Sequence, residues 1–273
     1  MTPSLKSLHI YPVKSCHRVD LETAELEPWG LAGDRRWLIT DEEGLKRTQR
    51  ELPRMALIQP TYSAEGGLCL TAPGMPELAL PPVSRADGAE RATVTVWRFT
   101  GPAARAGSAA DEWVTTFLGQ PSRLVRMDDT KVRPTDPEYS QAGDRVSFAD
   151  GYPLLLASTA SLAALGDWIV EMGGEPVPMT RFRPNLVIEG TEPWAEDSWK
   201  RIRIGGQVFR VVKRCGRCVM TTVDPELGSF SGQQPLKALR KYRREDKSVF
   251  FAVNLIPDTV GPLSVGEEFE VLD

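Results

Sequence analysis

The sequence is poor in the residues that hold metal ions in clusters, because its 273 residues include only four cysteines and two histidines. Cys215 and Cys218 are the one closely spaced pair of thiols. A structural zinc site needs four ligands, and zinc modules usually take them from two such pairs. The remaining candidates form no second pair, and they are Cys16, Cys69, His9 and His17. The spacing therefore argues against a structural zinc site.

We expect neither a leader nor a membrane span, and the sequence contains no nucleotide-binding fingerprint. Residues 1–10 have no long apolar core or cleavage signal, and no later window is apolar enough to span a bilayer. No Gly-x-Gly-x-x-Gly lies at a strand-to-helix turn, so we expect no dinucleotide site. A net charge of -4 and a pI near 5.5 argue against a general nucleic-acid binder. These absences predict a cytoplasmic protein with reduced cysteines and with small molecules or proteins as partners.

Short apolar segments separated by Gly, Pro and Asp dominate the first part of the chain. They fall at residues 5–13, 36–40, 67–71 and 92–99. Such segments are typical of strands, so this part is predicted to be a small antiparallel β domain. The period becomes helical at Ser108, whose spacing to Asp111 is that of a capping box, and the helix would end at Gly119. A linker is expected at residues 121–132.

The second part of the chain mixes helices and strands. Ser158 or Thr159 is expected to cap a helix that ends before Gly173-Gly174. Gly205-Gly206 predicts a hairpin between strands at 202–204 and 208–212. Further strands are predicted at 186–188, 249–256 and 269–272, and a last helix at about 235–243. The hydrophobic content of 41% is that of an ordinary globular protein.

The close-spaced thiols lie between two guanidiniums, those of Arg214 and Arg217. Neighbouring positive charge favours the thiolate, the form that binds metals and attacks electrophiles. A thioredoxin-like dithiol would open a helix, whereas the β-branched run at 219–223 and the following Asp224-Pro225 predict a strand and then a turn. Two interpretations stay open on the local sequence: a single thiolate on a soft, redox-active metal, or two small packing residues.

Three basic clusters follow predicted strands or turns, or lead into a strand. Lys14-Ser15 ends the first strand, Arg35-Arg36 follows a tight turn, and Arg181 to Asn185 leads into an apolar strand. Lysine with a hydroxyl suits phosphate, and planar guanidiniums suit phosphate or carboxylate. The amide and guanidinium of the third cluster can contact the edge of a heterocycle. Together the clusters predict a pocket for an anionic, nitrogen-rich cofactor and a soft metal.

Five segments in order carry a family resemblance: YPVKSC, GDRRWLI, RFRPNLVI, residues 195–199, and CGRCVMTTVDPELG. They resemble the MOSC-domain proteins with an N-terminal β-barrel extension, among them the mitochondrial amidoxime-reducing component and its bacterial counterparts. The resemblance covers nearly the whole chain. It implies a mainly β (α+β) fold, with an N-terminal antiparallel β-barrel domain at 1–120 and a MOSC β-barrel domain with a few flanking helices at 121–273.

The resemblance also implies a molybdenum cofactor, a molybdopterin with one molybdenum per chain held by one protein thiolate. The family's ligand falls on Cys218, which leaves Cys215 as a neighbour. The other positions implied as cofactor-binding are Lys14, Ser15, Arg35, Arg36, Arg183, Asn185, Gly216 and Arg217. Asp150 matches the family's acid and would position the substrate or assist proton delivery. At Gly151-Tyr152 the chain departs from the Thr-Ser of the mitochondrial relative.

The implied activity is reduction of small N-hydroxylated or N-oxygenated compounds, such as amidoximes, hydroxylamines and N-hydroxylated bases. No cysteine cluster remains for an iron–sulfur centre, so a separate donor protein, ferredoxin-like or a flavoprotein reductase, is expected to supply the electrons. The alternative is a carrier of sulfur or of molybdenum cofactor that uses a cysteine persulfide. A metal-free interaction domain would leave the basic clusters unexplained.

Overall fold

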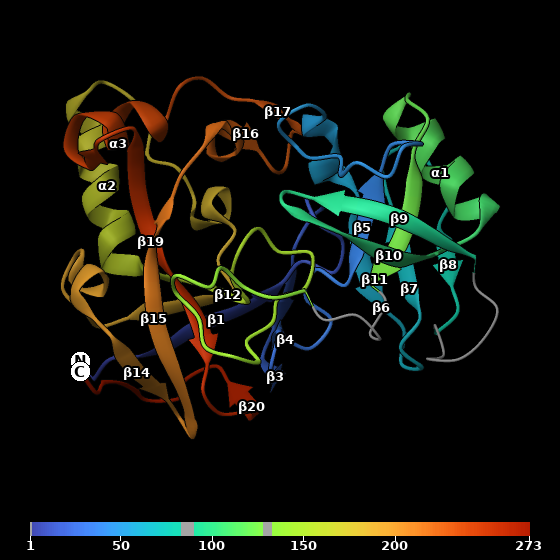
Figure 1. Cartoon of the computed structure of the whole chain (residues 1–273). Helices are drawn as coiled ribbons and strands as arrows, with labels where there is room; N and C mark the ends of the chain where they lie inside the picture. The colour runs from blue at the N-terminus through green and yellow to red at the C-terminus, as the bar shows by residue number, and fades with distance from the viewer. Residues whose placement is uncertain (1, 83–89, 128–132) are drawn as a thin grey trace.

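The computed structural model of the chain describes residues 2–82, 90–127 and 133–273. Its architecture is mainly β, as predicted, with three α-helices and five sheets in the described residues. Figure 1 shows two halves side by side, one built around the long strands β15 and β19 and the other around β9, β10 and β11. None of the helices in the described ranges is long and apolar enough to span a membrane.

The largest sheet has nine strands and forms the body of the C-terminal half. Its order is β2-β1-β13-β12-β19-β15-β14-β21, and β18 also pairs with β19. Its strands are β1 (Ser4–Ile10), β2 (Val19–Leu21), β12 (Leu154–Ser158), β13 (Leu186–Glu189), β14 (Arg201–Ile204), β15 (Gln207–Gly216), β18 (Arg244–Glu245), β19 (Ser248–Pro257) and β21 (Phe269–Val271). The predicted hairpin at Gly205-Gly206 is confirmed, since Ile204 pairs with Gln207.

Four smaller sheets complete the β structure. A four-stranded sheet in the N-terminal half contains β5 (Trp37–Thr40), β11 (Arg123–Met127), β10 (Phe99–Arg105) and β9 (Arg91–Val96). One three-stranded sheet contains β6 (Gln59–Tyr62), β7 (Leu68–Thr71) and β8 (Leu78–Leu80), and another contains β20 (Gly261–Ser264), β3 (Thr23–Glu27) and β4 (Gly30–Leu31). The last pair is β16 (Val223–Asp224) with β17 (Ser229–Phe230).

The helices pack apolar faces against these sheets. The α-helices are α1 (Ser108–Leu118), α2 (Thr159–Glu171) and α3 (Leu236–Tyr242), and the 3-10 turns are η1 (Pro53–Leu57), η2 (Met179–Phe182), η3 (Ala195–Ser198) and η4 (Val219–Thr222). Ser158 caps α2 as predicted, because its side chain accepts a hydrogen bond from the amide of Ala160. Helix α1 ends at Gly119 in the left-handed conformation, also as predicted.

Several local predictions are wrong. Ser108 is the first residue of α1 and does not cap it; Gly107 holds the N-cap position without a side-chain bond. The β-branched run after Cys218 forms the 3-10 turn η4 before the short strand β16, because two of its hydroxyls, those of Thr221 and Thr222, bond back to carbonyls three residues earlier. The segment predicted as one strand at 92–99 is interrupted by a turn, since β9 ends at Val96 and β10 begins at Phe99.

Two segments join sheets that the sequence pattern does not predict. Strand β1 pairs with β13 in the large sheet, not with the N-terminal half that follows it in the chain. The segment expected as a linker contains β11, which lies between β5 and β10, while residues 128–132 lie outside the described ranges. As a result, the chain passes between the two halves more than once, and residues distant in sequence meet where the halves touch.

Candidate functional site

A cavity of about 340 Å³ lies between the two halves of the molecule. Residues 14–97 contribute a lysine, a serine, two arginines and a tryptophan to its wall, namely Lys14, Ser15, Arg35, Arg50 and Trp97. The C-terminal half contributes Asp150, Tyr152, Arg181, Arg183, Asn185, Cys215, Gly216, Arg217 and Cys218 among others. The structure thus brings together every site residue predicted from the sequence except Arg36, in a volume typical of small-molecule sites.

Backbone strain is concentrated at this cavity. Seven described residues other than glycine have a positive φ, and four of them line the cavity: Ser15, Arg35, Trp97 and Arg183. Each such residue costs of the order of 1 kcal/mol or more, and it persists only where the surroundings hold it. Strain of this kind clusters at ligand sites, so its location supports a functional role for the cavity.

The floor of the cavity is cationic and rigid. The ring of Tyr11 lies between two guanidiniums, with the Arg35 and Arg183 carbons 4.5 and 4.1 Å from its centroid. Arg35 donates to Asp34 at 2.6 Å and to the side-chain oxygen of Asn185 at 3.0 Å. Burial raises the pKa of Tyr11 to about 12, so the ring stays neutral. The two cations are therefore held in place without being fully neutralised.

Arg183 is the cation with the least compensation. Burial lowers its pKa to about 10, even though it remains charged at neutral pH. Its Nη2 is buried without a hydrogen-bond partner. An unpaired buried donor costs free energy unless a ligand satisfies it. Arg183 thus provides an open donor for an anion or for a hydrogen-bond acceptor on a ring.

The hydrogen bonds of Asn185 go to other groups of the protein. Its side-chain oxygen accepts from Arg35 and from the Leu155 amide at 3.2 Å, and its side-chain nitrogen donates to the His9 carbonyl at 3.1 Å. The residue is fully buried. These bonds tie β1 to β12 and orient Arg35, so Asn185 is a positioning residue.

Lys14 and Asp150 form an ion pair across the cavity, with 2.5 Å between Nζ and Oδ1. The Lys14 side chain is only 7% exposed, and burial lowers its pKa to about 8 although Asp150 opposes this. Burial works against ionisation of Asp150, but the Lys14 and Arg50 cations outweigh it and hold the pKa of Asp150 below its ordinary value. Asp150 is therefore a carboxylate at neutral pH and accepts hydrogen bonds, including one from the indole of Trp97 at 3.1 Å.

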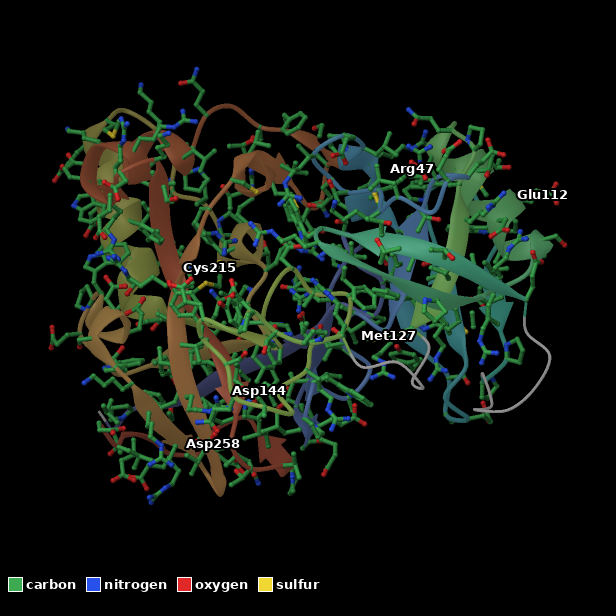
Figure 2. The ribbon with its side chains drawn as sticks, in the orientation of Figure 1. Arg47, Glu112, Met127, Asp144, Cys215 and Asp258 are labelled. Carbon is green, nitrogen blue, oxygen red and sulfur yellow. The ribbon has the colours of Figure 1, made fainter. Side chains whose placement is uncertain are left out.

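The segment that carries Asp150 is held by two arginines. Arg133 donates to the carbonyls of Ser147, Ala149 and Asp150 at 2.7, 2.5 and 2.7 Å. Further along the segment, Arg210 of β15 donates to both oxygens of Asp144 and, through Nε, to Asp258. Figure 2 shows Asp144 and Asp258 close together near the lower end of β15. These hydrogen bonds tie the loop that carries Asp150 to the rest of the structure at two points.

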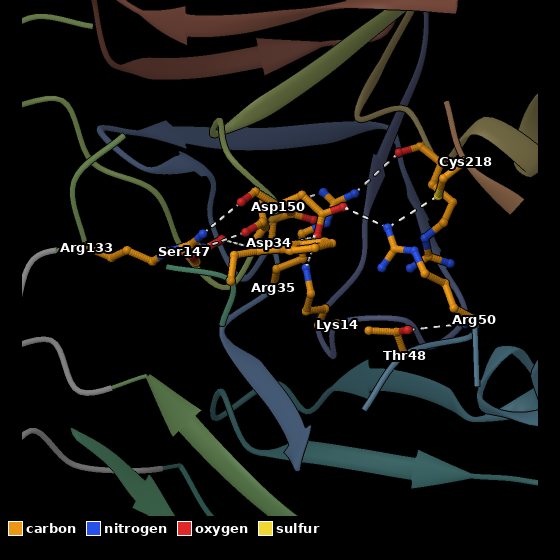
Figure 3. A network of polar contacts seen from close by, with 12 residues as sticks. Lys14, Asp34, Arg35, Thr48, Arg50, Arg133, Ser147, Asp150 and Cys218 are labelled. Carbon is orange, nitrogen blue, oxygen red and sulfur yellow. Dashed lines mark hydrogen bonds and ion pairs between the residues drawn. The ribbon is translucent and has the colours of Figure 1, made fainter. Parts of the chain in front are cut away.

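Each thiol of the Cys-x-x-Cys pair has its own guanidinium. Arg217 donates to the Cys215 sulfur at 3.0 Å, and Arg50 donates to the Cys218 sulfur at 3.3 Å. Arg50 also lies 3.7 Å from Asp150, so it joins the thiol to the carboxylate (Figure 3). Both cysteines are free thiols, Cys215 at the end of β15 and Cys218 at the start of η4.

Arg50 and Trp97 were not found by sequence reasoning. The Thr48 hydroxyl and amide both bond to Glu51, a Thr-x-x-Glu spacing that marks a local turn around Arg50. That signal predicts a turn but not which distant residue Arg50 contacts. Trp97 lies at the turn between β9 and β10, inside a segment expected to be continuous strand.

Arg36 is the predicted residue that does not belong to the cavity. Its guanidinium lies over the ring of Trp29, 4.3 Å from the centroid, and the residue is buried away from the lining set. Arg35 lies in a turn with a positive φ and its guanidinium contacts the ring of Tyr11, so the two adjacent side chains diverge.

Tyr152 belongs to the Gly151-Tyr152 pair, where the sequence departs from the Thr-Ser of the mitochondrial relative. It lines the cavity, and its hydroxyl is buried without a hydrogen-bond partner.

The donor set fits an anionic cofactor that brings its own metal ligands. Across residues 2–82, 90–127 and 133–273, no group of three or more His, Cys, Asp or Glu side chains could hold a metal ion. A metal at Cys218 therefore needs ligands from a cofactor, and a soft thiolate suits a soft metal. The unpartnered donors of Arg183 and Tyr152 and the cations Lys14 and Arg35 are what such an anionic group requires.

Two family models match the chain: the MOSC N-terminal beta barrel domain at residues 2–121 and the MOSC domain at residues 143–270. Mitochondrial amidoxime-reducing component 1 of Xenopus laevis is 35% identical over 256 residues, which cover 90% of this chain and 73% of the relative. The Homo sapiens protein of the same name is 34% identical, covering 98% and 83%. Mitochondrial amidoxime reducing component 2 of Bos taurus is 32% identical, covering 97% and 82%. The chain belongs to the family of MOSC proteins with an N-terminal β-barrel domain that includes the mitochondrial amidoxime-reducing components.

Proposed function

We propose that the protein is a molybdenum-cofactor-dependent reductase of N-hydroxylated compounds, and that the cavity between its halves is the active site. The observation that carries this proposal is the placement of Cys218: a free thiol, contacted by Arg50, at the wall of a cavity lined with cations and one carboxylate. The names of the relatives support the reaction class. When bound, the cofactor would supply two-electron redox chemistry.

The cations of the cavity would hold the anionic part of the cofactor. Lys14, Ser15 and Arg35 lie on one side and offer charge and a hydroxyl, the combination that suits a phosphate. Arg183, with its unpartnered Nη2, would donate to the pterin or to the phosphate. Gly216 and Arg217 lie next to both thiols and would face the metal end, where Cys218 is the proposed ligand.

Asp150 would orient the substrate. Because its pKa is held below the ordinary value, it is a carboxylate at neutral pH and can accept a hydrogen bond from the N–OH or N–H group of an amidoxime. It is a poor proton donor for the same reason. The overall reaction takes up two electrons and two protons, breaks the N–O bond, and releases water and the amidine or amine.

The electrons would come from a separate one-electron donor protein. Nicotinamide delivers hydride, and the sequence offers no dinucleotide fingerprint. Purified, molybdenum-loaded protein should therefore reduce a simple amidoxime with reduced viologen, and NADH or NADPH alone should give no turnover. Turnover of homogeneous, flavin-free protein by NADH, or no viologen-driven turnover by molybdenum-loaded protein, would contradict the proposal.

A further inference from the structure

A second cavity, of about 380 Å³, is also lined by Cys218. Cys218 and Arg217 line both cavities, so this second cavity adjoins the proposed metal end of the first. Its wall also carries three exposed cations, Arg240, Arg244 and Lys247, over a base of aliphatic side chains. None of these three residues is used by the proposed function.

The surface around this second cavity is basic in a chain that is acidic overall. Residues 236–247 include six lysines or arginines and two acids, whereas the whole chain has a net charge of -4. One of the two acids, Glu245, is already paired with Arg214. The segment forms α3 and the turn into β19, at the upper edge of the molecule in Figure 1. Such charge separation favours association with an acidic surface.

One exposed apolar side chain, that of Val219, accompanies the charge, and two more follow it in the chain. Eight large hydrophobic residues are exposed in the described part of the chain, and three of them lie within the 12 residues after Cys218: Val219, Leu227 and Phe230, which are 44%, 68% and 48% exposed. Val219 lines the second cavity. Phe230 belongs to β17 and Leu227 to the turn before it, and Figure 1 shows this hairpin at the upper edge, apart from α3. An exposed aliphatic side chain next to arginines, as Val219 is, is typical of protein interfaces.

The cations suit a large acidic surface better than a small anion. A fixed phosphate site uses buried donors with set geometry, as the first cavity does. Here all three cations are exposed, Arg240 in the last turn of α3, Arg244 at the start of β18 and Lys247 in the turn before β19. Mobile, solvated cations raise association rates through their long-range field and form weak, reversible contacts.

We propose that α3 and the turn that follows it form the docking surface for an acidic one-electron donor protein, which approaches Cys218 through the second cavity. This inference rests on the proposed function. Electron transfer slows steeply with distance, and this face offers the donor a route to Cys218 through a cavity whose wall is otherwise different from that of the cavity that would hold cofactor and substrate. Each turnover requires two successive one-electron transfers, each of which leaves the donor oxidised by one electron.

The test compares two double variants with equal changes in charge. Arg240→Glu/Lys247→Glu alters the proposed docking surface, and Lys200→Glu/Arg203→Glu alters exposed cations at β14, at the opposite end of the same half in Figure 1. The probes are an acidic [2Fe–2S] ferredoxin and an acidic flavodoxin. Equilibrium binding of each oxidised probe and the rate of electron transfer from each reduced probe are measured at several salt concentrations, with reduced viologen as the small donor.

We expect the docking-surface variant to lose at least about tenfold in binding and in transfer rate with one or both probes, and to lose most of the salt dependence. The control variant should stay within about twofold of wild type, and viologen-driven turnover should be unchanged in both. Equal losses in the two variants, or no binding of either probe while viologen still works, would overturn the docking surface alone. Failure of viologen-driven turnover in wild type would instead overturn the proposed function.

Discussion

The two walls of the central cavity differ in what they contribute. Among the described lining residues, each half contributes three cations, but both thiols and the one carboxylate, Asp150, lie in the wall from the C-terminal half. The contacts that cross between the walls include those of Lys14 and Trp97 with Asp150, of Arg35 with Asn185, and of Arg50 with Cys218. The difference teaches that the thiols and the carboxylate come from one half while the cations around them come from both, so the complete set is assembled only where the halves meet.

The largest expected effect lies on the thiol wall. Cys218→Ser should lower viologen-driven amidoxime reduction by at least about a thousandfold, because a hard, poorly ionised hydroxyl replaces the soft thiolate. Cys215→Ser is the matched control and should keep most of the activity, since Cys215 contacts Arg217 and lies beside the proposed ligand. Steady-state kinetics of both variants decides; equal losses would point to a dithiol mechanism.

Two cations of the wall from the N-terminal half should act on cofactor binding. Lys14→Ala or Arg35→Ala removes a charge-assisted contact of roughly 1.5–3 kcal/mol and should lower cofactor affinity about 10–100-fold. Pterin and molybdenum content of the purified variants measures the effect, with the exposed Lys200→Ala as the control. Full occupancy in both Lys14 and Arg35 variants would show that the anionic group binds elsewhere.

The pKa of Lys14 predicts that cofactor binding depends on pH. The pKa of Lys14 is about 8, so the cation that binds an anion is lost as pH rises through this value. Cofactor loading of the apo-protein should therefore weaken above pH 8, by as much as about tenfold per pH unit. Asp150 stays ionised throughout this range, and Arg183 titrates later, near 10. Lys14→Arg should keep loading constant to higher pH; a wild-type profile that is flat from pH 7 to 9.5 would contradict the assignment.

Substitution of Arg50, which contacts groups on the opposite wall, should have the smallest effect on activity. Arg50→Gln removes the cation near both Cys218 and Asp150 and leaves a shorter, neutral donor, so a loss of activity of about three- to tenfold is expected. Arg50→Lys keeps the charge and should restore part of the loss. Cofactor content should remain near that of wild type in both variants. A fall in cofactor content as large as that of Lys14→Ala would instead assign Arg50 to the residues that bind the anionic part of the cofactor.

Local features of the fold were predictable because their signals are local. The hairpin at Gly205-Gly206 and the Ser158 cap depend on residues within one turn of each other. The pairing of β1 with β13 was not predictable, because the apolar residues Leu5, Leu8 and Ile10 indicate a strand but not its partner. The prediction of a linker at residues 121–132 missed β11 for the same reason, since β11 becomes a central strand only by pairing with β5 and β10.

The candidate site divides in the same way. Lys14, Arg35, Arg183 and Cys218 occur in short motifs and could be selected from the sequence. Arg50 and Trp97 could not, because their role comes from contacts with Cys218 and Asp150 more than 50 residues away. Arg36 was selected together with Arg35 but does not line the cavity, because a pair of adjacent arginines does not indicate which of the two side chains faces it.

The most direct test of the central claim is the metal and pterin content of protein expressed with molybdate. One thiolate ligand implies about one molybdenum atom and one pterin per chain in wild type. Cys215→Ser should retain this content, and Cys218→Ser should lose the molybdenum. Wild-type protein that is folded yet holds little molybdenum and carries a persulfide on a cysteine would contradict this account and would identify a sulfur carrier.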